Sequence, residues 1–491
     1  MAAIAPGATS AQPTQDLLWC APSLTAPSFM SANLFSNLNI SPAQLEALDA
    51  LGYHAMTPVQ GQALPPALAG RDLIVRARTG SGKTATFGIA LLTRINPRFL
   101  GVQGLVLCPT RELADQVAGE IRRLASRMAN IKVLLLCGGK PFGPQRDSLQ
   151  HGAHIVVGTP GRVKDHIDRQ TLDLSGVTTL VLDEADRMLE MGFADAMQAV
   201  VSRAPTSRQT LLFSATYPDD IRQISQRLQR DPVTVTVEDE VAHDEATIEQ
   251  VFYEVRKHER QTTLLALFEH YRPNNAVVFC STKKQCAEVA VFLNEHDIEA
   301  RAIHGDLDQR ERDQVLLQFA NGSSPVLVAT DVAARGLDIK ALDMVINVEL
   351  PRDPEIYVHR VGRTGRAGST GKAMSIVVES EAPRLRAIED YQRQPCICDV
   401  LASLNRDPNY ALVATMVTIQ LDAGRKQKVR AGDILGALTG DAGLAGSSIG
   451  KITILDNSSY VAIERPALRQ AMNYLSQGKV KGRSIRARRL R

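Results

Sequence analysis

The sequence predicts an α/β protein with two parallel-sheet domains followed by a small α+β domain. Three observations lead to this prediction. The length is 491 residues, which at about 150 residues per domain allows about three domains. Short apolar runs alternate with helical stretches from about residue 70 to residue 380, and the pattern changes after about residue 405. Apolar residues make up 44% and charged residues 22%, proportions that exclude a wholly disordered chain.

The apolar runs predict strands that are buried on both faces. They are apolar at consecutive positions, which is typical of parallel strands covered by helices on both sides. Asp231-Pro232 and an acidic stretch separate two sets of runs. We therefore expect domains at residues 34–235 and 248–405, joined by a linker at 236–247. The runs are 104–109, 154–158, 179–183 and 210–214 in the first set, and 276–280, 325–330 and 343–347 in the second.

The last eighty residues predict a different kind of sheet, and we expect a separate domain at 410–491. The predicted order β-α-β-β-α-β is typical of a small RRM-like sheet with helices on one side. The expected elements are a strand at 416–421, a helix at 430–439, strands at 451–455 and 460–463, a helix at 466–475 and a strand at 484–488.

The first 33 residues predict a disordered tail, because they are rich in Ala, Pro, Ser and Thr. They contain no Lys or Arg, which argues against a secretory or transit signal. The sequence contains no apolar run of 18 residues, so no membrane span is predicted. The seven cysteines form no CxxC pair, as expected for reduced thiols. We therefore expect a cytoplasmic protein that has no membrane partner.

Charge is divided unevenly along the chain. The formal net charge is only +3, but residues 410–491 contain 14 Lys and Arg against five Asp and Glu. That segment therefore carries +9, and residues 1–409 carry −6. Its basic final stretch, 479–491, is typical of a nucleic-acid-binding surface.

Residues 77–84 predict a phosphate-binding loop, because they follow the apolar segment 72–75 and open a predicted helix. Glycines let backbone N–H groups approach a phosphate chain, and the start of the helix adds partial positive charge. Lys83 is expected to reach the β- and γ-phosphates, and Thr84 to ligate Mg²⁺. The whole loop is assigned to binding the phosphate chain of a nucleotide: Ala77, Arg78, Thr79, Gly80, Ser81, Gly82, Lys83 and Thr84.

The acidic run Asp183-Glu-Ala-Asp186 ends the predicted strand at 179–183. A carboxylate at such a strand end is suited to hold Mg²⁺, and the next carboxylate is suited to activate the attacking water. We expect Asp183 in the first role and Glu184 in the second.

Together with further motifs, these residues resemble the DEAD-box RNA helicases over about residues 34–380. The resemblance implies two RecA-like domains and an ATP hydrolase that uses ATP and Mg²⁺. In the first domain the motifs are Thr57-Pro-Val-Gln60, the loop 77–84, Pro109-Thr-Arg-Glu-Leu113, Gly138-Gly139, Thr159-Pro-Gly-Arg162, Asp183-Glu-Ala-Asp186 and Ser214-Ala-Thr216. In the second they are Gln309-Arg-Glu-Arg312, Thr330-Asp-Val-Ala-Ala-Arg-Gly-Leu-Asp338 and His359-Arg-Val-Gly-Arg-Thr-Gly-Arg366.

The resemblance implies a role for each matching residue. Gln60 would read adenine, because an amide offers both a donor and an acceptor, with Phe35 and Tyr53 at the base and Asp338 at the ribose. Arg363 and Arg366 would reach the γ-phosphate from the second domain, so hydrolysis would require domain closure. Coupling of hydrolysis to strand separation would involve Asp186, Ser214, Thr216 and His359.

The resemblance also implies a set of contacts to the RNA backbone. Contacts of this kind address sugar and phosphate, so the core alone would bind without sequence preference. The 2′-hydroxyl would distinguish RNA from DNA. The implied residues are Pro109, Thr110, Arg111, Gly138, Gly139, Thr159, Pro160, Gly161, Arg162, Gln309, Arg312 and Thr330.

The C-terminal segment resembles that of the bacterial DbpA subgroup, through residues 430–444, 449–452 and 478–482. Phe142 and residues 145–151 are also similar to that subgroup. The resemblance implies recognition of a hairpin in 23S ribosomal RNA and a role in assembly of the large ribosomal subunit. An ordinary RRM stacks bases on aromatic side chains, whereas the central strands here offer one. Candidate RNA contacts are Lys451, Tyr460, Lys479, Lys481, Arg483 and Arg488.

The leading interpretation is an ATP-dependent RNA helicase that unwinds short duplexes locally, directed by its C-terminal domain, and we expect a monomer. One alternative is an ATP-timed RNA clamp that assists assembly without productive unwinding, which would carry the same motifs. Another is a DNA translocase, against which Gln60 and the Asp-Glu-Ala-Asp run weigh, so no DNA partner is expected.

Overall fold

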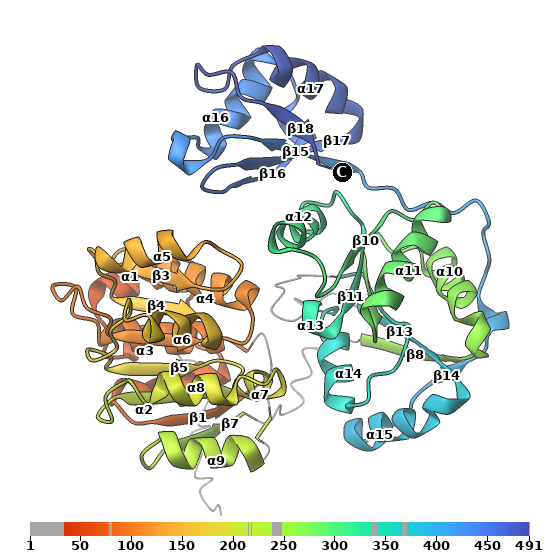
Figure 1. Ribbon diagram of the computed structural model, residues 1–491. Coiled ribbons are helices and arrows are strands. Elements are labelled where there is room, and N and C mark those ends of the chain that lie inside the picture. Colours follow the sequence, from red (N-terminus) through yellow and green to blue (C-terminus); the bar gives the residue numbers. More distant parts are fainter. Residues whose placement is uncertain are drawn as a thin grey trace, which may run out of the picture.

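The computed structural model in Figure 1 describes residues 34–77, 81–214, 216–217, 219–237, 248–334, 342–365 and 371–490. These residues form three units, each built around its own sheet. The expected tail at 1–33 lies outside the described residues, as does nearly all of the expected linker. Five expected site residues also lie outside them: Arg78, Thr79, Gly80, Asp338 and Arg366.

The first unit is a seven-stranded parallel sheet in the order β3-β4-β2-β5-β6-β1-β7. Its strands are β1 Leu73–Arg76, β2 Gly104–Leu107, β3 Val133–Leu136, β4 Ile155–Gly158, β5 Thr179–Leu182, β6 Gln209–Ser214 and β7 Val233–Thr236. Its helices are η1 Phe35–Asn37, α1 Pro42–Ala50, α2 Pro58–Leu68, α3 Lys83–Thr93, α4 Arg111–Leu124, α5 Phe142–Gln150, α6 Pro160–Asp168, α7 Ala185–Glu190, α8 Ala194–Val201 and α9 Asp219–Leu228.

The second unit repeats this plan in the order β10-β11-β9-β12-β13-β8-β14, again all parallel. Its strands are β8 Ile248–Glu254, β9 Ala276–Cys280, β10 Ala300–Ile303, β11 Val326–Thr330, β12 Met344–Asn347, β13 Gly371–Val377 and β14 Cys398–Asp399. Its helices are η2 Lys257–Glu259, α10 Arg260–Tyr271, α11 Lys283–Glu295, α12 Gln309–Ala320, α13 Asp331–Ala334, α14 Pro354–Val361, η3 Glu379–Glu381, α15 Ala382–Gln392 and η4 Leu401–Ser403.

Both sheets are buried on both faces, as the consecutive apolar residues predict. In β2, Val106 packs in one core, whereas Leu105 and Leu107 pack in the core on the opposite face. In β9, Val278 and its neighbour Val277 are divided between two cores in the same way. The predicted parallel α/β class is therefore confirmed for both units.

The third unit is a four-stranded antiparallel sheet in the order β16-β17-β15-β18. Its core joins strands and helices on one face, with Ile419 and Val461 against Ile434 and Leu475. Its elements are β15 Met416–Leu421, η5 Arg425–Gln427, α16 Ala431–Gly436, the π-turn η6 Ala437–Asp441, η7 Gly446–Ser448, β16 Ile449–Ile454, β17 Ser459–Glu464, η8 Arg465–Ala467, α17 Leu468–Gln477 and β18 Ala487–Arg489.

The predicted β-α-β-β-α-β order is confirmed, and the structure shifts several boundaries by up to three residues, including the start of the last strand. The last strand begins at Ala487 rather than at residue 484, because pairing with β15 begins only there. A tight turn lies just before residue 484, with Lys481 and Gly482 at positive φ and Val480 paired to Arg483. Among the described residues, no helix combines the length and apolar character needed to cross a membrane.

Candidate functional site

The phosphate-type loop lies between the end of β1 and the start of α3. Gly82 precedes the helix at φ +94°, a conformation that favours glycine. A Cβ at Gly82 would also lie 2.6 Å from Gln60 Nε2. Lys83, the first residue of α3, is only 7% exposed, and its Nζ donates to the backbone oxygen of Ala77 at 2.7 Å. The lysine is therefore held inside the loop, where a phosphate chain would be bound.

Gln60 is fixed against this loop by the start of α2. Thr57 and Gln60 form a capping box, in which the Thr57 N–H donates to Gln60 Oε1 at 2.8 Å. The Thr57 hydroxyl donates to the Ser81 backbone oxygen at 2.8 Å, and Gln60 Nε2 donates to that of Gly82 at 3.4 Å. Nearby, the rings of Phe35 and Tyr53 meet edge to face at 6.3 Å. The structure thus gathers the expected adenine-side residues beside the loop.

The acidic run begins where β5 ends. Burial and the neighbouring Glu184 raise the pKa of Asp183 to about 7, partly offset by Lys83. Glu184 itself has left-handed backbone angles, φ 51° and ψ 54°. Such a conformation is uncommon outside glycine and is found where surrounding structure enforces it, often at functional sites.

The donor set fits a divalent cation. Asp183 is a buried carboxylate beside a second carboxylate, an arrangement that a positive ion would stabilise. Carboxylate and hydroxyl oxygens are the ligands that Mg²⁺ prefers, and Thr84 follows Lys83 at the start of α3.

Asp186 connects the acidic run to the segment after β6. Its Oδ2 accepts from both the N–H and the hydroxyl of Thr216, each at 3.0 Å. Ser214 is fully buried, and its Oγ is among the described polar atoms that have no hydrogen-bond partner. Three of the four expected coupling residues therefore lie at this junction.

The fourth coupling residue, His359, reaches the junction from the second domain. Its ring contacts the Arg187 guanidinium, one residue beyond Asp186. Burial and Arg187, with smaller contributions from Arg363 and Lys83, lower the pKa of His359 to about 3 against the opposing charge of Asp186, so the imidazole is neutral at pH 7. The α14 residues of the second domain thus face the acidic run and loop of the first.

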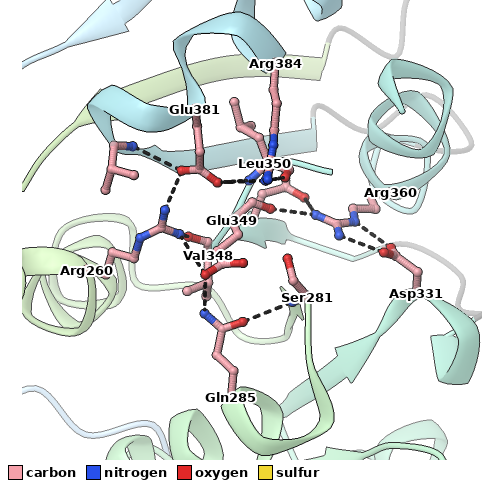
Figure 2. Close-up of polar contacts among 12 residues, drawn as sticks. Arg260, Ser281, Gln285, Asp331, Val348, Glu349, Leu350, Arg360, Glu381 and Arg384 are labelled. Carbon is pink, nitrogen blue, oxygen red and sulfur yellow. Dashed lines mark hydrogen bonds and ion pairs between the residues drawn. The ribbon is translucent and has the colours of Figure 1, made fainter. Parts of the chain in front are cut away.

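Figure 2 shows how α14 is anchored within its own domain. The Arg360 guanidinium grips Asp331 with two bonds, Nε to Oδ1 at 2.6 Å and Nη2 to Oδ2 at 2.9 Å. Its Nη1 donates to the Glu349 backbone oxygen at 2.9 Å. Arg360 follows His359 directly on α14, so this anchor fixes the helix that carries His359 and leads to Arg363.

The buried carboxylate of Glu381 supports the loop after β12. Glu381 is 4% exposed and contacts Arg260. It also accepts from the backbone N–H groups of Leu350 at 3.2 Å and Val378 at 3.1 Å. The network continues through Glu349, whose carboxylate accepts from Gln285 at 3.0 Å. These bonds fix the segment that leads into α14.

Expected RNA contacts from both domains meet at the start of α12. Arg111 Nη1 donates to Gln309 Oε1 at 2.7 Å, and Arg312 pairs with Glu112 at 3.3 Å. Gly139, at φ +75°, packs against Arg111, and a Cβ at Gly139 would lie 3.1 Å from Gln309 Cβ. The two domains therefore bring these motifs to one place.

Arg162 belongs to a separate network in the first domain. Its Nη1 donates to Gln145 Oε1 at 2.9 Å and to the Lys140 backbone oxygen at 3.0 Å. His166 Nε2 also bonds Gln145 Oε1, at 3.1 Å, and its ring stacks on Phe142 at 4.1 Å. Gln145 is 6% exposed and donates to the Cys137 backbone oxygen. The DbpA-like residues Phe142 and Gln145 thus orient Arg162.

The remaining core positions are at strand and helix ends. Thr110 caps α4 by accepting from the Leu113 N–H at 3.2 Å. Thr159 and Pro160 begin α6, and a Cβ at Gly161 would meet nothing within 4 Å, which leaves room for a backbone to approach. Thr330 ends β11 apart from these groups.

The candidate contacts of the third domain divide into exposed and engaged residues. Lys451, Lys479, Lys481 and Arg483 are exposed, although Lys481 Nζ donates to Asp433 and to the Lys428 backbone oxygen. Arg488 donates to Gln420 at 3.3 Å. Tyr460 is only 5% exposed, so in this arrangement its ring offers no face to a base.

Several site residues were not among those expected from the sequence. Glu112, Arg187 and Asp331 lie inside or beside the quoted motifs, so their position was a signal that went unused. Arg360 also lies within a motif, but its role depends on the packing of α14. Nothing in the sequence indicates Glu381, whose partners come from distant segments.

The fold and site together define a two-domain P-loop nucleotide hydrolase, with the loop in the first domain and basic residues supplied by the second. Three family models match the chain: "DEAD/DEAH box helicase" at residues 57–224, "Helicase conserved C-terminal domain" at 259–368 and "DbpA RNA binding domain" at 418–489.

The ATP-dependent RNA helicase DbpA of Escherichia coli is 52% identical over 93% of this chain and 99% of its own. The DbpA of Bacillus subtilis is 38% identical over 92% and 98% of the two chains. The chain therefore belongs to the DEAD-box ATP-dependent RNA helicases and, within them, to the DbpA group. It is an ATP-hydrolysing enzyme whose partner is RNA.

Solved structures of related proteins share the two-domain core. Saccharomyces cerevisiae Dbp5 bound to RNA and ADP BeF3 has a TM-score of 0.69 and 32% identity, covering 75% of this chain and 96% of its own. Mss116p bound to ssRNA and AMP-PNP has a TM-score of 0.66 and 28% identity, covering 74% and 77%.

Proposed function

We propose that this RNA helicase is directed by its C-terminal domain to a hairpin of 23S ribosomal RNA and acts in assembly of the large ribosomal subunit. The observation that carries the proposal is the DbpA-type domain at 418–489, with its exposed basic segment. The exposed side chains of this segment are Lys479, Lys481, Arg483, Arg486 and Arg489. The named DbpA relatives extend over nearly the whole chain, which supports the same function here.

ATP would be bound by the loop at 77–84, with Gln60 at the adenine and Asp338 at the ribose. Lys83 would contact the terminal phosphates, and Thr84 with Asp183 would hold Mg²⁺, which supplies neutralisation of phosphate charge when bound. Glu184, held at its strained turn, would orient and activate the water. Arg363 and Arg366 would approach the γ-phosphate from the second domain. In related systems such arginines contribute about 10³–10⁵ in rate.

Hydrolysis would be coupled to RNA through the contacts between domains. The Asp186–Thr216 link and the His359–Arg187 contact join the acidic run to α14. The RNA backbone would lie along the core positions named above, from Arg111 and Arg162 to Gln309, Arg312 and Thr330. Closure by ATP and RNA would bend one strand and open a short duplex; product release would reopen the cleft.

The C-terminal domain would recognise RNA through its edge and loops rather than through stacking. Tyr460, the one aromatic side chain of its central strands, is buried. Lys451, Lys479, Arg483 and the neighbouring basic side chains remain exposed. We further propose a monomer located in the cytoplasm.

The decisive experiment compares ATP hydrolysis with a panel of ribosomal RNA fragments, for the full chain and for a chain ending after Val413. The shortened chain keeps Tyr410 and Leu412, because both side chains pack on the second domain. We expect unchanged basal hydrolysis and loss of preference for one fragment in the shortened chain. Equal stimulation of the full chain by every fragment would contradict the proposal. A second assay places a short duplex beside the preferred fragment and measures strand release. Release indicates a helicase, and no release indicates a clamp.

A further inference from the structure

Helix α12 is engaged at both ends by different domains. At its start, Gln309 and Arg312 contact Arg111 and Glu112 of the first domain. At its end, Gln318 Nε2 donates to the Leu490 backbone oxygen of the C-terminal domain at 3.3 Å. Figure 1 shows α12 on the side of the second domain that faces the C-terminal sheet.

The contact at the end of α12 is buried and polar. Ser323 and Thr418 share a hydrogen bond between their hydroxyls at 2.7 Å, and Asn321 Nδ2 lies 3.5 Å from Thr418 Oγ1. Thr418 is fully buried, and Gln318 is 4% exposed. Buried polar groups are costly unless they are hydrogen-bonded, so these bonds favour one docked orientation. They also cover part of the sheet face on which an RRM usually binds bases.

A second set of bonds fastens the connection to the C-terminal domain. Glu299 accepts from Arg465 Nη2 at 2.8 and 2.9 Å, and from the Ala414 N–H at 2.9 Å. Arg465 Nε donates to the Ala414 backbone oxygen at 2.9 Å. Leu412 pairs with Ile298 beside the second domain's sheet. The C-terminal domain is therefore docked at two places and not merely tethered.

The helix between these contacts is short and firmly packed. Its 12 residues span about 18 Å at 1.5 Å per residue. Val315, Leu316 and Phe319 pack on the core of the second domain. A helix held in this way moves as one body, so a shift at its end would be felt at Gln309 and Arg312.

We propose that α12 couples RNA binding by the C-terminal domain to the RNA contacts between the two helicase domains. The inference rests on the proposed function, in which the C-terminal domain binds a structured ribosomal RNA. RNA held by that domain fixes the end of α12 through Leu490 and Thr418, while the Arg465–Glu299 pair holds the orientation in which the two domains dock. Helix α12 in turn places Gln309 and Arg312 for closure on the strand. An RNA bound by the C-terminal domain would then stimulate ATP hydrolysis more than an RNA of the same length that binds only the two helicase domains.

The test separates RNA capture from its transmission. In the full chain, Glu299→Ala and Arg465→Ala each remove the partly exposed pair, whose side chains are 37% and 38% exposed, so folding should be preserved. A second variant, Ser323→Ala with Thr418→Val, removes the buried hydroxyl contact. Two probes are used: poly(U), and transcribed large-subunit ribosomal RNA. Readouts are kcat and the half-saturating RNA concentration of ATP hydrolysis, and nucleotide-free binding of the ribosomal RNA.

We expect unchanged poly(U)-stimulated hydrolysis and unchanged nucleotide-free binding in all variants. The preference for ribosomal RNA over poly(U) in hydrolysis should fall at least about fivefold, the range of ordinary coupling energies. The swapped pair Glu299→Arg with Arg465→Glu should recover part of it. Retained preference in every variant would overturn the coupling while leaving the proposed function standing. No preference in the unmodified chain would overturn both.

Discussion

At the scale of single residues, the strained turn at Glu184 marks the proposed catalytic carboxylate. The backbone places Glu184 at φ 51° between β5 and α7, beside buried Asp183. Glu184→Gln keeps the size and shape of the side chain but removes its ability to accept a proton. We expect steady-state ATP hydrolysis to fall at least about 100-fold, with ATP-dependent RNA binding retained. Glu295→Gln, exposed on α11, is the control; normal turnover in Glu184→Gln would overturn the assignment.

Gln145 is expected to act through Arg162. Its Oε1 accepts from both Arg162 and His166 inside the first domain. Gln145→Leu keeps the bulk but frees the guanidinium, so the half-saturating RNA concentration should rise about tenfold, as for loss of a charge-assisted bond, with kcat nearly unchanged. Gln150→Leu, exposed on the same helix, should behave like the unmodified chain. An unchanged RNA requirement in Gln145→Leu would contradict the positioning role.

His166 predicts a pH dependence of stability. Burial, with Arg162 as the next cause, lowers the pKa of His166 from 6.5 to about 4. As pH falls, the unfolded chain therefore protonates this histidine before the folded chain does. The contribution of neutral His166 to the free energy of unfolding is complete above pH 6.5 and is lost towards pH 4. The loss amounts to about 3 kcal/mol at roughly 1.4 kcal/mol per pKa unit. His166→Gln should flatten thermal stability between pH 7 and pH 4.5, whereas His151→Gln, an exposed histidine, should not.

At the scale of elements, α14 depends on one ion pair for its position. Arg360 is 2% exposed at the side chain, and both of its bonds to Asp331 are short. Asp331 is 23% exposed at the side chain, so its removal should cost less than the about 3–5 kcal/mol typical of a fully buried pair. Asp331→Asn should therefore lower the melting temperature of the full chain and reduce kcat for ATP, because His359 and Arg363 lose their orientation. Asp297→Asn, in an exposed turn, serves as the control. A normal kcat in Asp331→Asn would show that α14 needs no such anchor.

Most inner strands were predictable because their burial on both faces leaves consecutive apolar residues. The inner strands β8 Ile248–Glu254 and β13 Gly371–Val377 were missed, because polar residues interrupt their apolar ones. Runs such as 104–109 and 276–280 correspond to β2 and β9, in the middle of their sheets. Among the edge strands, β7 and β10 interrupt their apolar residues with polar, partly exposed ones, so they contain no such run. The edge strand β3 does contain one, at 133–136, although its two middle residues are partly exposed. The last strand was placed three residues early because alternation in 484–488 begins directly after a turn, whereas pairing with β15 begins only at Ala487.

The candidate site was predictable where its chemistry is local and unpredictable where it crosses domains. The loop around Lys83 and the run from Asp183 to Asp186 are contiguous, and their residue types follow from phosphate and Mg²⁺ chemistry. Arg187 and His359, by contrast, are 172 positions apart, and Glu112 meets Arg312 only after both domains have folded. Tertiary packing also decides which side chains of the C-terminal sheet are buried. The position of Tyr460 in its strand therefore predicted an RNA contact, whereas in the folded chain its ring is buried.

At the scale of the whole molecule, the net charge of +3 divides into −6 before residue 410 and +9 after it. If the exposed basic segment contacts RNA phosphates, each contact releases counterions and steepens the salt dependence of binding by about 0.7–0.9. Replacing Lys479, Arg483 and Arg486 with Ala should therefore reduce the slope of log affinity against log salt by about 2–3. Nucleotide-free binding of large-subunit ribosomal RNA between 50 and 200 mM salt, a range over which about 10³–10⁵ in affinity is lost by strongly charged binders, measures that slope.

The control for this measurement is a second triple variant of equal charge. Arg227, Lys257 and Lys284 are exposed on the helicase domains, outside the proposed RNA contacts. Their replacement with Ala lowers the total charge by the same three units but should leave the slope within about 0.5 of the unmodified chain, because distant charges are screened beyond about 10 Å at 0.1 M salt. Equal slopes in the two variants would mean that total charge, and not the C-terminal surface, governs the encounter with RNA.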